Sequence, residues 1–386
     1  MMSKKSPQLR FEGFTDDWEE RKLSDVANHR GGTAIEKYFD KDGVYKVISI
    51  GSYGLNSQYV DQNIRAISNE ITDGRVVNSG ELTMVLNDKT ANGTIIGRTL
   101  LVEKDNEYVI NQRTEIISPK ENFDSNFAYT ILNGPFREKV KRIVQGGTQI
   151  YVNYPAVSNL NLELPMIEEQ QKIGSFFKQL DDTIALHQRK LDLLKEQKKG
   201  YLQKMFPKNG AKVPELRFAG FADDWEERKF KDILKTHSFR SYLAGVSENG
   251  EYEVIQQGNK PIVGYSDGEP FTDYKDVTLF GDHTVSLYKP KSPFFVATDG
   301  VKILSADNFE GDYLYTTLER YKPEPQGYKR HFTILKNQDV WFTENMEEQQ
   351  KIGSFFKQLD ETIDLHQRKL DLLKEQKKGF LQKMFV

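Results

Sequence analysis

The chain has 386 residues and a formal net charge of −3, with 37% hydrophobic and 29% charged side chains. That charge argues against a basic surface over the whole chain, of the kind that many small DNA-binding proteins carry. The absence of cysteine excludes disulfides, iron–sulfur clusters and thiolate zinc sites, and no apolar run approaches the ~20 residues that span a membrane. Residues 1–11 lack the apolar core of a secretory signal, so we expect a cytoplasmic protein.

The first element along the chain is a short motif that occurs twice. Residues 9–22 read LRFEGFTDDWEERK and residues 216–229 read LRFAGFADDWEERK, so that 12 of 14 positions agree. A longer repeat follows each motif, at residues 168–206 and 347–385, where 36 of 39 positions agree. Internal repeats of this length indicate that both halves of the chain are built on one frame.

The first insert between these repeats, residues 23–167, is predicted to be a mixed α/β domain. Runs rich in β-branched residues and bounded by Gly, Asn and Asp predict strands at Val44–Ile50, Glu81–Asn87, Thr94–Glu103 and Glu107–Ser118. A helix is expected at Ser125–Gln145, and an extended tail is expected around Leu160–Leu164, where leucines alternate.

Polar loops in this insert supply the candidates for DNA contact. Asn, Gln, Arg and Lys side chains read base edges, while Thr and Tyr suit phosphates. The candidates are Lys89, Thr90, Asn92, Arg98, Gln112, Arg113, Gln145, Thr148, Gln149 and Tyr151. The alternative for each of them is an ordinary solvated loop, in which Asn and Gly serve the turn geometry.

Residues 168–206 are predicted to form one long helix. Apolar residues recur with 4-3-4-3 spacing over four heptads, and Pro207 follows where the helix should stop. We call this stripe the seam and expect it to pack against a second helix or to dock a partner. Its positions are Ile173, Phe177, Leu180, Ile184, His187, Leu191 and Leu194.

The second long helix, residues 347–385, carries the same seam. Its positions are Ile352, Phe356, Leu359, Ile363, His366, Leu370 and Leu373. The linker 207–215 reaches at most ~30 Å when extended. This short reach favours an antiparallel coiled coil with one domain at each end and an approximate two-fold axis.

Polar residues interrupt the seam at equivalent places in both helices. His187 and His366 lie at the midpoints of the two repeats. We expect them to set the register of the helix pair, rather than to bind a metal or sense pH, because two histidines make an incomplete zinc site. Lys198 and Lys377 are expected to extend from the seam into water.

The second insert, residues 230–346, has 117 residues against 145 in the first, and the two do not align convincingly. We expect strands at Glu251–Gln257, His283–Tyr288 and Phe294–Leu304, a helix at Asp312–Tyr321 and a returning β segment at Gly327–Phe342. Basic and aromatic side chains give the DNA candidates Lys289, Lys291, Tyr328, Lys329, Arg330 and His331. The formal charges are −2 and −4 for the two inserts, so any positive potential must be confined to one face of each.

Motifs that carry catalysis are missing from the sequence. It contains no phosphate-binding loop, dinucleotide turn, H-E-x-x-H or nucleophile elbow, and the histidines outside the seam lack metal-ligand spacing. We therefore expect no catalytic residue, metal site or cofactor in this chain.

These elements define the domain organisation that we predict. The fold class is α+β, with a first recognition domain at residues 1–167 and a first spacer helix at 168–206. A linker at 207–215 leads to a second recognition domain at 216–346 and a second spacer helix at 347–386.

Two unlike domains, each followed by a helix that opens E-x-Q-x-x-I and continues F-x-x-L-D-x-x-I, resemble the specificity subunit of type I restriction–modification enzymes. The pattern is carried by Glu168, Gln170, Ile173, Phe177, Leu180, Asp181 and Ile184, and again by Glu347, Gln349, Ile352, Phe356, Leu359, Asp360 and Ile363. Trp18-Glu19 and Trp225-Glu226 look like the lead-in to the target-recognition domains of that family. The resemblance covers essentially the whole chain.

The resemblance implies a non-catalytic subunit that binds double-stranded DNA. Each domain is expected to read one half of a bipartite, asymmetric site, while the helices fix the gap between the halves. Two modification subunits are expected to methylate adenine with S-adenosylmethionine, and two restriction subunits to use ATP and Mg. A function of another class stays open at this point, namely a coiled-coil scaffold whose inserts bind proteins or glycans.

Overall fold

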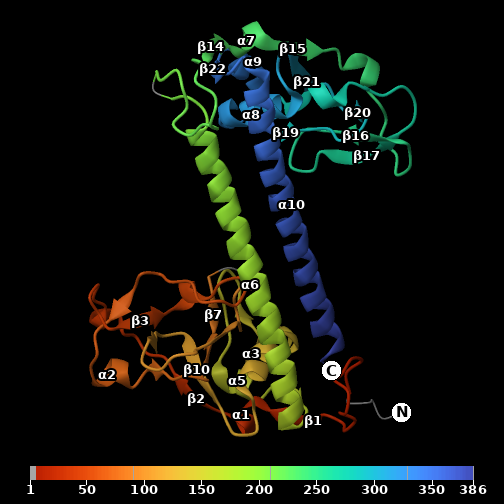
Figure 1. The fold of residues 1–386 in the computed structure, drawn as a ribbon. Coiled ribbons are helices and arrows are strands. Elements are labelled where there is room, and N and C mark those ends of the chain that lie inside the picture. The colour runs from red at the N-terminus through yellow and green to blue at the C-terminus, as the bar shows by residue number, and fades with distance from the viewer. Residues whose placement is uncertain (1–5, 90, 209, 328, 386) are drawn as a thin grey trace. The chain divides into compact units, whose positions relative to one another are not determined.

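The computed structural model describes residues 6–385 except 90, 209 and 328. The chain divides into two compact units, which we call unit 1 (Met1–Leu186 with Leu370–Val386) and unit 2 (His187–Lys369). Both divisions fall within the long helices α6 (Ile167–Lys204) and α10 (Met346–Lys383). Each unit therefore contains the beginning of one long helix and the end of the other (Figure 1).

Unit 1 is a mixed α/β domain built on an antiparallel sheet. The order of this sheet is β2 (Ala27–Gly31), β10 (Thr114–Pro119), β6 (Leu82–Val85) and β8 (Thr99–Leu101). A second sheet has the order β4 (Arg65–Ala66), β3 (Tyr45–Ile48), β9 (Tyr108–Ile110) and β5 (Val76–Val77). Two small sheets pair β1 (Glu19–Lys22) with β13 (Asn161–Leu164), and β11 (Gln145–Gly146) with β12 (Ile150–Tyr151) and β7 (Asn87–Asp88). The helices are α1 (Leu23–Val26), α2 (Glu70–Asp73), α3 (Ser125–Asn133), α4 (Pro135–Lys141) and α5 (Tyr154–Ser158), with 3-10 turns at Glu36–Tyr38 and Ile50–Ser52.

Unit 2 repeats this topology with fewer elements. Its main sheet has the order β15 (Leu234–His237), β21 (Val301–Ala306), β18 (Thr278–Gly281) and β19 (Leu287–Tyr288). The second sheet has the order β17 (Ile262–Ser266), β16 (Tyr252–Ile255) and β20 (Phe294–Val296), and β14 (Glu226–Lys229) pairs with β22 (Asp339–Phe342). The helices are α7 (Phe230–Ile233), α8 (Gly311–Tyr321) and α9 (His331–Lys336), with 3-10 turns at Arg240–Tyr242 and Tyr274–Asp276.

The two inserts thus share one topology although their sequences do not align. Each main sheet uses the same strand order, and each second sheet contains one parallel pair, β3 with β9 and β16 with β20. Most of the extra length of the first insert lies in three connections, one of which joins β3 to β4. The connection from β6 to β8 carries β7, and the connection from α3 to α5 carries α4, β11 and β12.

Several predicted segments differ from the structure, and the strand expected at Phe294–Leu304 is divided into β20 and β21. The strand expected at Glu107–Ser118 is interrupted by a turn in which Arg113 has a φ of 66°, which gives β9 and β10. The helix expected at Ser125–Gln145 is divided by Gly134, followed by Pro135 as the first residue of α4. The β segment expected at Gly327–Phe342 is wrong for its first part, which forms α9, and only Asp339–Phe342 is a strand.

Each unit completes its hydrophobic core with a ring from the end of a long helix. In unit 1, Phe385 contacts Trp18 and Phe177, with ring centroids 6.0 and 5.9 Å apart. In unit 2, Phe206 contacts Trp225 at 5.5 Å. Phe206 and Phe385 come shortly after the last helical residues of α6 and α10. The helical part of each long repeat therefore ends just before the phenylalanine whose ring lies in the core.

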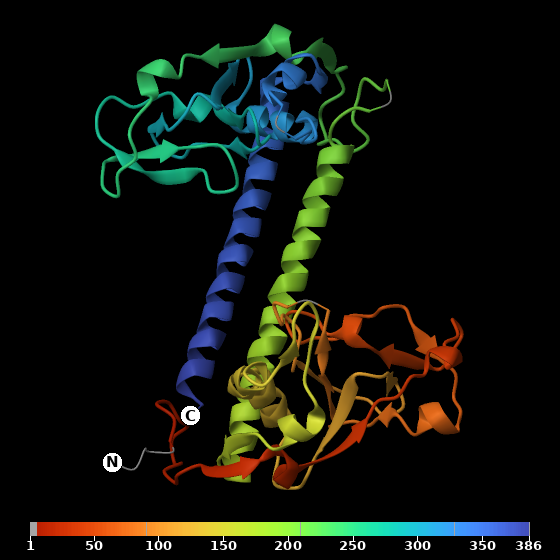
Figure 2. The same cartoon turned by 180° about the vertical axis from the view of Figure 1, so that it is seen from behind.

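The long helices run antiparallel within each unit (Figures 1 and 2). In unit 2, Tyr201 contacts Phe355, while Lys198 lies 2.6 Å from Asp360, which comes later on α10. A residue that comes earlier on α6 therefore contacts a residue that comes later on α10, as expected for antiparallel helices. In unit 1, Phe176 and Phe380 form the equivalent pair, with centroids 5.0 Å apart. The predicted antiparallel pairing is confirmed.

The seam lysines form ion pairs between the helices and do not extend into water as predicted. Lys377 Nζ lies 2.5 Å from Asp181 in unit 1. Lys198 Nζ lies 2.6 Å from Asp360 and 2.5 Å from Glu319 of α8 in unit 2. Both ammonium groups bind carboxylates on neighbouring elements. The residue pattern of one helix does not indicate these partners, because they lie far away in the sequence.

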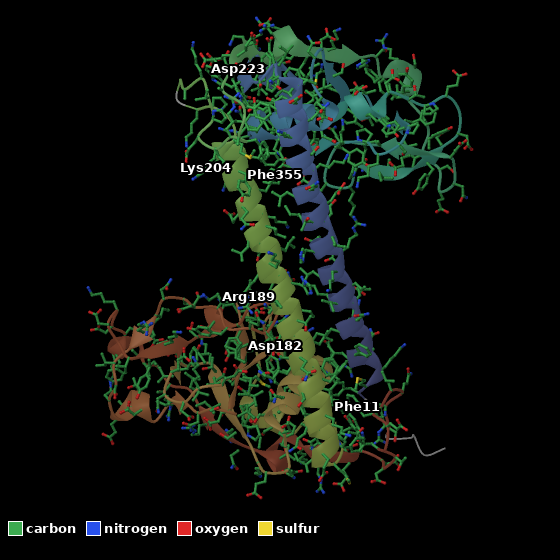
Figure 3. The ribbon with its side chains drawn as sticks, viewed as in Figure 1. Phe11, Asp182, Arg189, Lys204, Asp223 and Phe355 are labelled. Atoms are coloured by element: carbon green, nitrogen blue, oxygen red, sulfur yellow. The ribbon has the colours of Figure 1, made fainter. Side chains whose placement is uncertain are left out.

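The duplicated short motif fastens each unit to the start of its long helix. Arg10 donates two hydrogen bonds to Glu169, at 2.9 and 2.7 Å, and Arg217 donates two to Glu348, at 2.6 and 2.8 Å. These are bidentate arginine–carboxylate pairs. Figure 3 shows Phe11 beside the beginning of α6, where its ring packs on Phe176.

Candidate nucleic-acid interface

Three of the polar segments predicted to contact DNA meet at one edge of the main sheet of unit 1. Leu86 donates its backbone N–H to Arg113 O, at 3.0 Å, and accepts from Val152 N, at 2.9 Å. Beside it, Asp88 pairs with Ile150 in the sheet of β11, β12 and β7. The turn after β9, the loop after β6 and the hairpin of β11 and β12 are therefore neighbours. We call this group of loops the unit 1 interface.

Two arginines hold the loop from β7 to β8 in place. Arg137 of α4 is buried and donates to the carbonyl oxygens of Ile96, Gly93 and Thr94, at 2.9, 3.0 and 2.8 Å. Burial and the neighbouring Arg98 lower the pKa of Arg137 to about 10, so it stays charged at neutral pH. Arg98 donates to Thr94 O and to Ser57 Oγ, both at 2.9 Å. Its guanidinium supports the loop from within.

Most of the remaining candidates in unit 1 are exposed at this edge. The exposed ones are Lys89, Asn92, Gln112, Arg113, Gln145, Thr148, Gln149 and Tyr151, whereas Thr90 lies outside the described residues. Arg113 adopts the left-handed conformation that is rare for residues other than glycine, and such outliers concentrate at functional sites. Gln112 donates to Glu36 Oε1, at 3.0 Å, so its amide is already engaged.

The equivalent connections also meet in unit 2, although they are shorter. Asp282, in the turn after β18, accepts from His331 N at 2.8 Å and from Phe332 N at 2.9 Å, at the start of α9. The connection from β18 to β19 thus lies against the connection from α8 to α9. Lys329 and Arg330 are exposed there, and Tyr328 lies outside the described residues.

Two candidates of unit 2 are engaged in contacts within the unit, which argues against a direct contact of their side chains with DNA. His331 is fully buried; its Nδ1 lies 3.0 Å from Asp282 O, and its Nε2 accepts from Gln326 N at 2.9 Å. Lys289 donates to Val277 O at 3.1 Å and to Lys275 O, and burial lowers the pKa of its ammonium group. Lys291 is exposed next to it.

A further polar loop of unit 2 was not among the candidates. Gln257 follows β16, and its Oε1 accepts from His283 N at 2.9 Å, while Gly258 N donates to Ser286 Oγ at 2.8 Å. The loop continues with exposed Asn259 and Lys260. Its sequence, QQGNK, has the Gly, Asn and Gln composition that marked the loops of the first insert.

The long helices carry a second candidate surface, distinct from the seam. Among the seam residues, Ile173, Phe177, Leu191, Leu194, Ile352, Phe356 and Leu370 are buried, while Leu180, Ile184, His187, Leu359, Ile363, His366 and Leu373 are partly buried. Four leucines outside the seam are instead exposed. Leu186, Leu193, Leu365 and Leu372 are 61, 61, 63 and 59% exposed.

These leucines occupy equivalent positions in the two repeats, seven residues apart. Unit 1 carries Leu186 and Leu372, and unit 2 carries Leu193 and Leu365. In the sequence, each of these leucines stands directly before a seam residue, on a helix face that is expected to be exposed to water. Because the same exposed leucines occur in both units, we treat them as a candidate surface for a protein partner.

No metal site or membrane helix is found in the part of the chain that the structure describes. It holds no group of three or more His, Asp or Glu side chains placed to bind a metal ion. None of its helices has the length and apolar composition to cross a membrane.

The family model of the type I restriction modification DNA specificity domain matches residues 15–196 and 222–375. A putative type I restriction enzyme MjaX specificity subunit of Methanocaldococcus jannaschii is 22% identical over 95% of this chain and 92% of that protein. The MjaVIII specificity subunit of the same organism is 26% identical over 48% of this chain, and the match spans under half of that relative, 44%.

A solved structure shares the fold over the whole length. It is the crystal structure of the S subunit of a type I restriction–modification system from M. genitalium, with a TM-score of 0.72. The match covers 99% of both chains at 16% sequence identity. At that identity the likeness supports the fold alone.

Proposed function

The chain belongs to the type I restriction–modification DNA specificity family, and from this premise we propose that its two units read the two halves of a bipartite DNA site. The observation that supports this most is the matched clustering of loops. In both units the connection after the third strand of the main sheet, β6 or β18, meets the connection that precedes the last short helix, α5 or α9. Because these loops differ in length and sequence, the two half-sites should differ as well. A scaffold that binds proteins or glycans is not favoured by the family match.

Side chains from these loops make the contacts to DNA in this proposal. In unit 1 we assign them to the exposed residues of the unit 1 interface, above all Lys89, Asn92 and Arg113. In unit 2 we assign them to Lys329, Arg330 and the loop at 256–260. Lys and Arg neutralise phosphates, while Asn, Gln and Arg recognise base edges in the major groove. Local clusters of this kind are compatible with a net charge of −3.

The long helices have two tasks in the proposal. First, α6 and α10 are continuous and antiparallel, so we infer that their length fixes the gap between the half-sites. Second, the exposed leucines give both units one surface, so we infer that two copies of one partner, the modification subunit, dock there. That partner supplies S-adenosylmethionine-dependent methylation of adenine. In this proposal, restriction subunits add cleavage that depends on ATP and Mg. The whole complex is proposed to act in the cytoplasm.

Mapping of adenine methylation tests the proposed function. The chain is produced together with the modification subunit encoded with it, in a host that lacks other adenine methyltransferases, and the genome is sequenced for N6-methyladenine. We expect methylated sites that share two unlike motifs with a fixed gap. Absence of a complex, or methylation without sequence preference, would contradict the proposal.

A further inference from the structure

An exposed histidine covers a buried carboxylate beside the unit 1 interface. His29 of β2 and Glu115 of β10 are joined by a short contact, with Nδ1 and Oε1 2.6 Å apart. The side chain of His29 is 53% exposed, whereas that of Glu115 is 8% exposed. A carboxylate is rarely buried without a partner, because desolvation penalises its charge. The histidine is thus the group that makes this burial tolerable.

The pair lies at the same sheet edge as the loops proposed to contact DNA. Glu115 is two residues from Arg113 and pairs in the ladder with Gly31, where β2 ends. On the other side of β10, Thr114 pairs with Val85, immediately before the loop that carries Lys89 and Asn92. His29 pairs in the ladder with Ile117, four residues along from Arg113, and therefore lies on the strand next to β10.

The histidine ring is held in a fixed orientation. The ring of Tyr154, on α5, lies 4.5 Å from the ring of His29 at an angle of 36°. Glu115 engages Nδ1. Because Nδ1 is engaged and the side chain is half exposed, Nε2 is the atom that a ligand can reach. In the protonated ring both nitrogens donate, so Nε2–H then presents a positively charged donor.

We propose that protonated His29, held by Glu115, binds a phosphate of the DNA backbone next to the unit 1 interface. This inference rests on the proposed function, because it takes DNA as the ligand of unit 1. A phosphate is favoured over a base because the pair presents one fixed cationic donor, without the second polar group that bidentate reading of a base needs.

Charged and titratable groups face His29 from the neighbouring elements. Glu115 faces it from β10 and Tyr154 from α5. Burial raises the pKa of Glu115, and the neighbouring His29 and Arg75 offset this rise only in part. Arg30, next to His29 on β2, donates to Glu81 at 3.0 Å and is thereby partly neutralised. The nearest full charge to the ring is therefore the carboxylate.

The salt dependence of DNA binding at two pH values tests this contact. The full chain is titrated with a pool of random-sequence duplexes, at about pH 6 and about pH 8, on either side of the ordinary histidine pKa of ~6.5. Each phosphate contact adds about −0.9 to the slope of log K against log salt concentration. We expect the wild-type slope to be steeper by about 0.9 at the lower pH, and His29→Gln to lose this difference.

A second histidine serves as the matched control. His237 lies on β15, the equivalent edge strand of unit 2, but its Nε2 is 2.8 Å from Ser305 Oγ, and no carboxylate of the described residues is paired with it. His237→Gln should keep the wild-type difference in slope. If His29→Gln also keeps it, or changes the selected half-site without changing the slope, the phosphate contact is overturned while the proposed function stands. A wild-type chain that binds no duplex would overturn the phosphate contact, while methylation mapping with the modification subunit tests the proposed function separately.

Discussion

Lys377 of α10 lies 2.5 Å from Asp181 of α6, and at the equivalent position of the other repeat Lys198 of α6 lies 2.6 Å from Asp360 of α10. A parallel, in-register pair of these helices would place equivalent residues side by side, lysine against lysine and aspartate against aspartate. The antiparallel arrangement replaces these repulsions by two attractions. The two ion pairs therefore favour the antiparallel direction of the helix pair.

The two lysines should differ in their effect on stability. Lys198 is also 2.5 Å from Glu319 and its side chain is 11% exposed, against 28% for Lys377. Removing Lys198 leaves two carboxylates close together, so Lys198→Ala should lower the free energy of unfolding by about 2–3 kcal/mol. Lys377→Ala should cost no more than about 1 kcal/mol. Chemical denaturation followed by tryptophan fluorescence measures both, with exposed Lys378→Ala as a neutral control. Equal losses for Lys198 and Lys377 would contradict this ranking.

The spacing of the half-sites should follow the length of the long helices. Insertion of one heptad after Gln188 and another after Gln367 preserves the phase of the seam. It lengthens each helix by about 10 Å, which corresponds to about three base pairs at 3.4 Å each. Methylation mapping should show an unchanged pair of motifs with a gap longer by about three base pairs. An unchanged gap would refute the spacer role.

Loss of the exposed leucines in one unit should remove one partner copy. Leu186→Lys with Leu372→Lys changes unit 1 only, and both residues are about 60% exposed, so folding should be unaffected within ~0.5 kcal/mol. Native mass spectrometry should then find one modification subunit per chain in place of two. Leu193→Lys with Leu365→Lys should do the same for unit 2. Retention of two copies by both double variants would exclude this surface.

Arg137 should matter for the first half-site alone. Arg137→Met removes three hydrogen bonds to the carbonyl oxygens of residues 93, 94 and 96, which costs about 1–3 kcal/mol and frees the loop that carries Asn92. Methylation mapping should show relaxed selection of one motif, while the other motif and the gap are retained. The control is Arg142→Met, at an exposed position nearby. Equal relaxation of both motifs would contradict the assignment of one half-site to each unit.

The seam residue His187 should make unit 2 less stable in acid. The Nδ1 atoms of His187 and His366 are 3.4 Å apart. Burial lowers the pKa of His187, with further contributions from Lys369 and His366. A lowered pKa in the folded state means that the unfolded chain binds more protons. The contribution is present above pH ~6.5 and is lost as the pH falls through the folded pKa. His187→Asn should reduce the loss of stability between neutral and mildly acidic pH, measured by denaturation. His237→Asn should leave that loss unchanged, and the same loss in His187→Asn would contradict the assignment.

Much of the frame could be predicted because its signals are local. The 4-3-4-3 spacing predicts α6 and α10, and the near-identity of the repeats predicts that both units are built alike. The segments with Asn, Gly and Gln, expected to be polar loops, are loops only in part, because β7, β11 and β12 lie within them. The common topology of the two inserts could not be predicted from the sequence, because their sheets pair strands such as β2 and β10 that lie far apart in the chain.

The composition and periodicity of the sequence by themselves determined a cysteine-free chain with two unlike α/β inserts between repeated helices. Only the tertiary structure decided which polar residues face outward. His331 and Lys289 resemble DNA-contacting residues in the sequence, yet in the structure they bind buried carbonyl groups. His29 was identified only from its contact with Glu115, which the sequence does not indicate. The physical reason is that helix periodicity is a property of neighbouring residues. Burial, ion pairing and the gathering of loops depend on partners that folding brings from far along the chain.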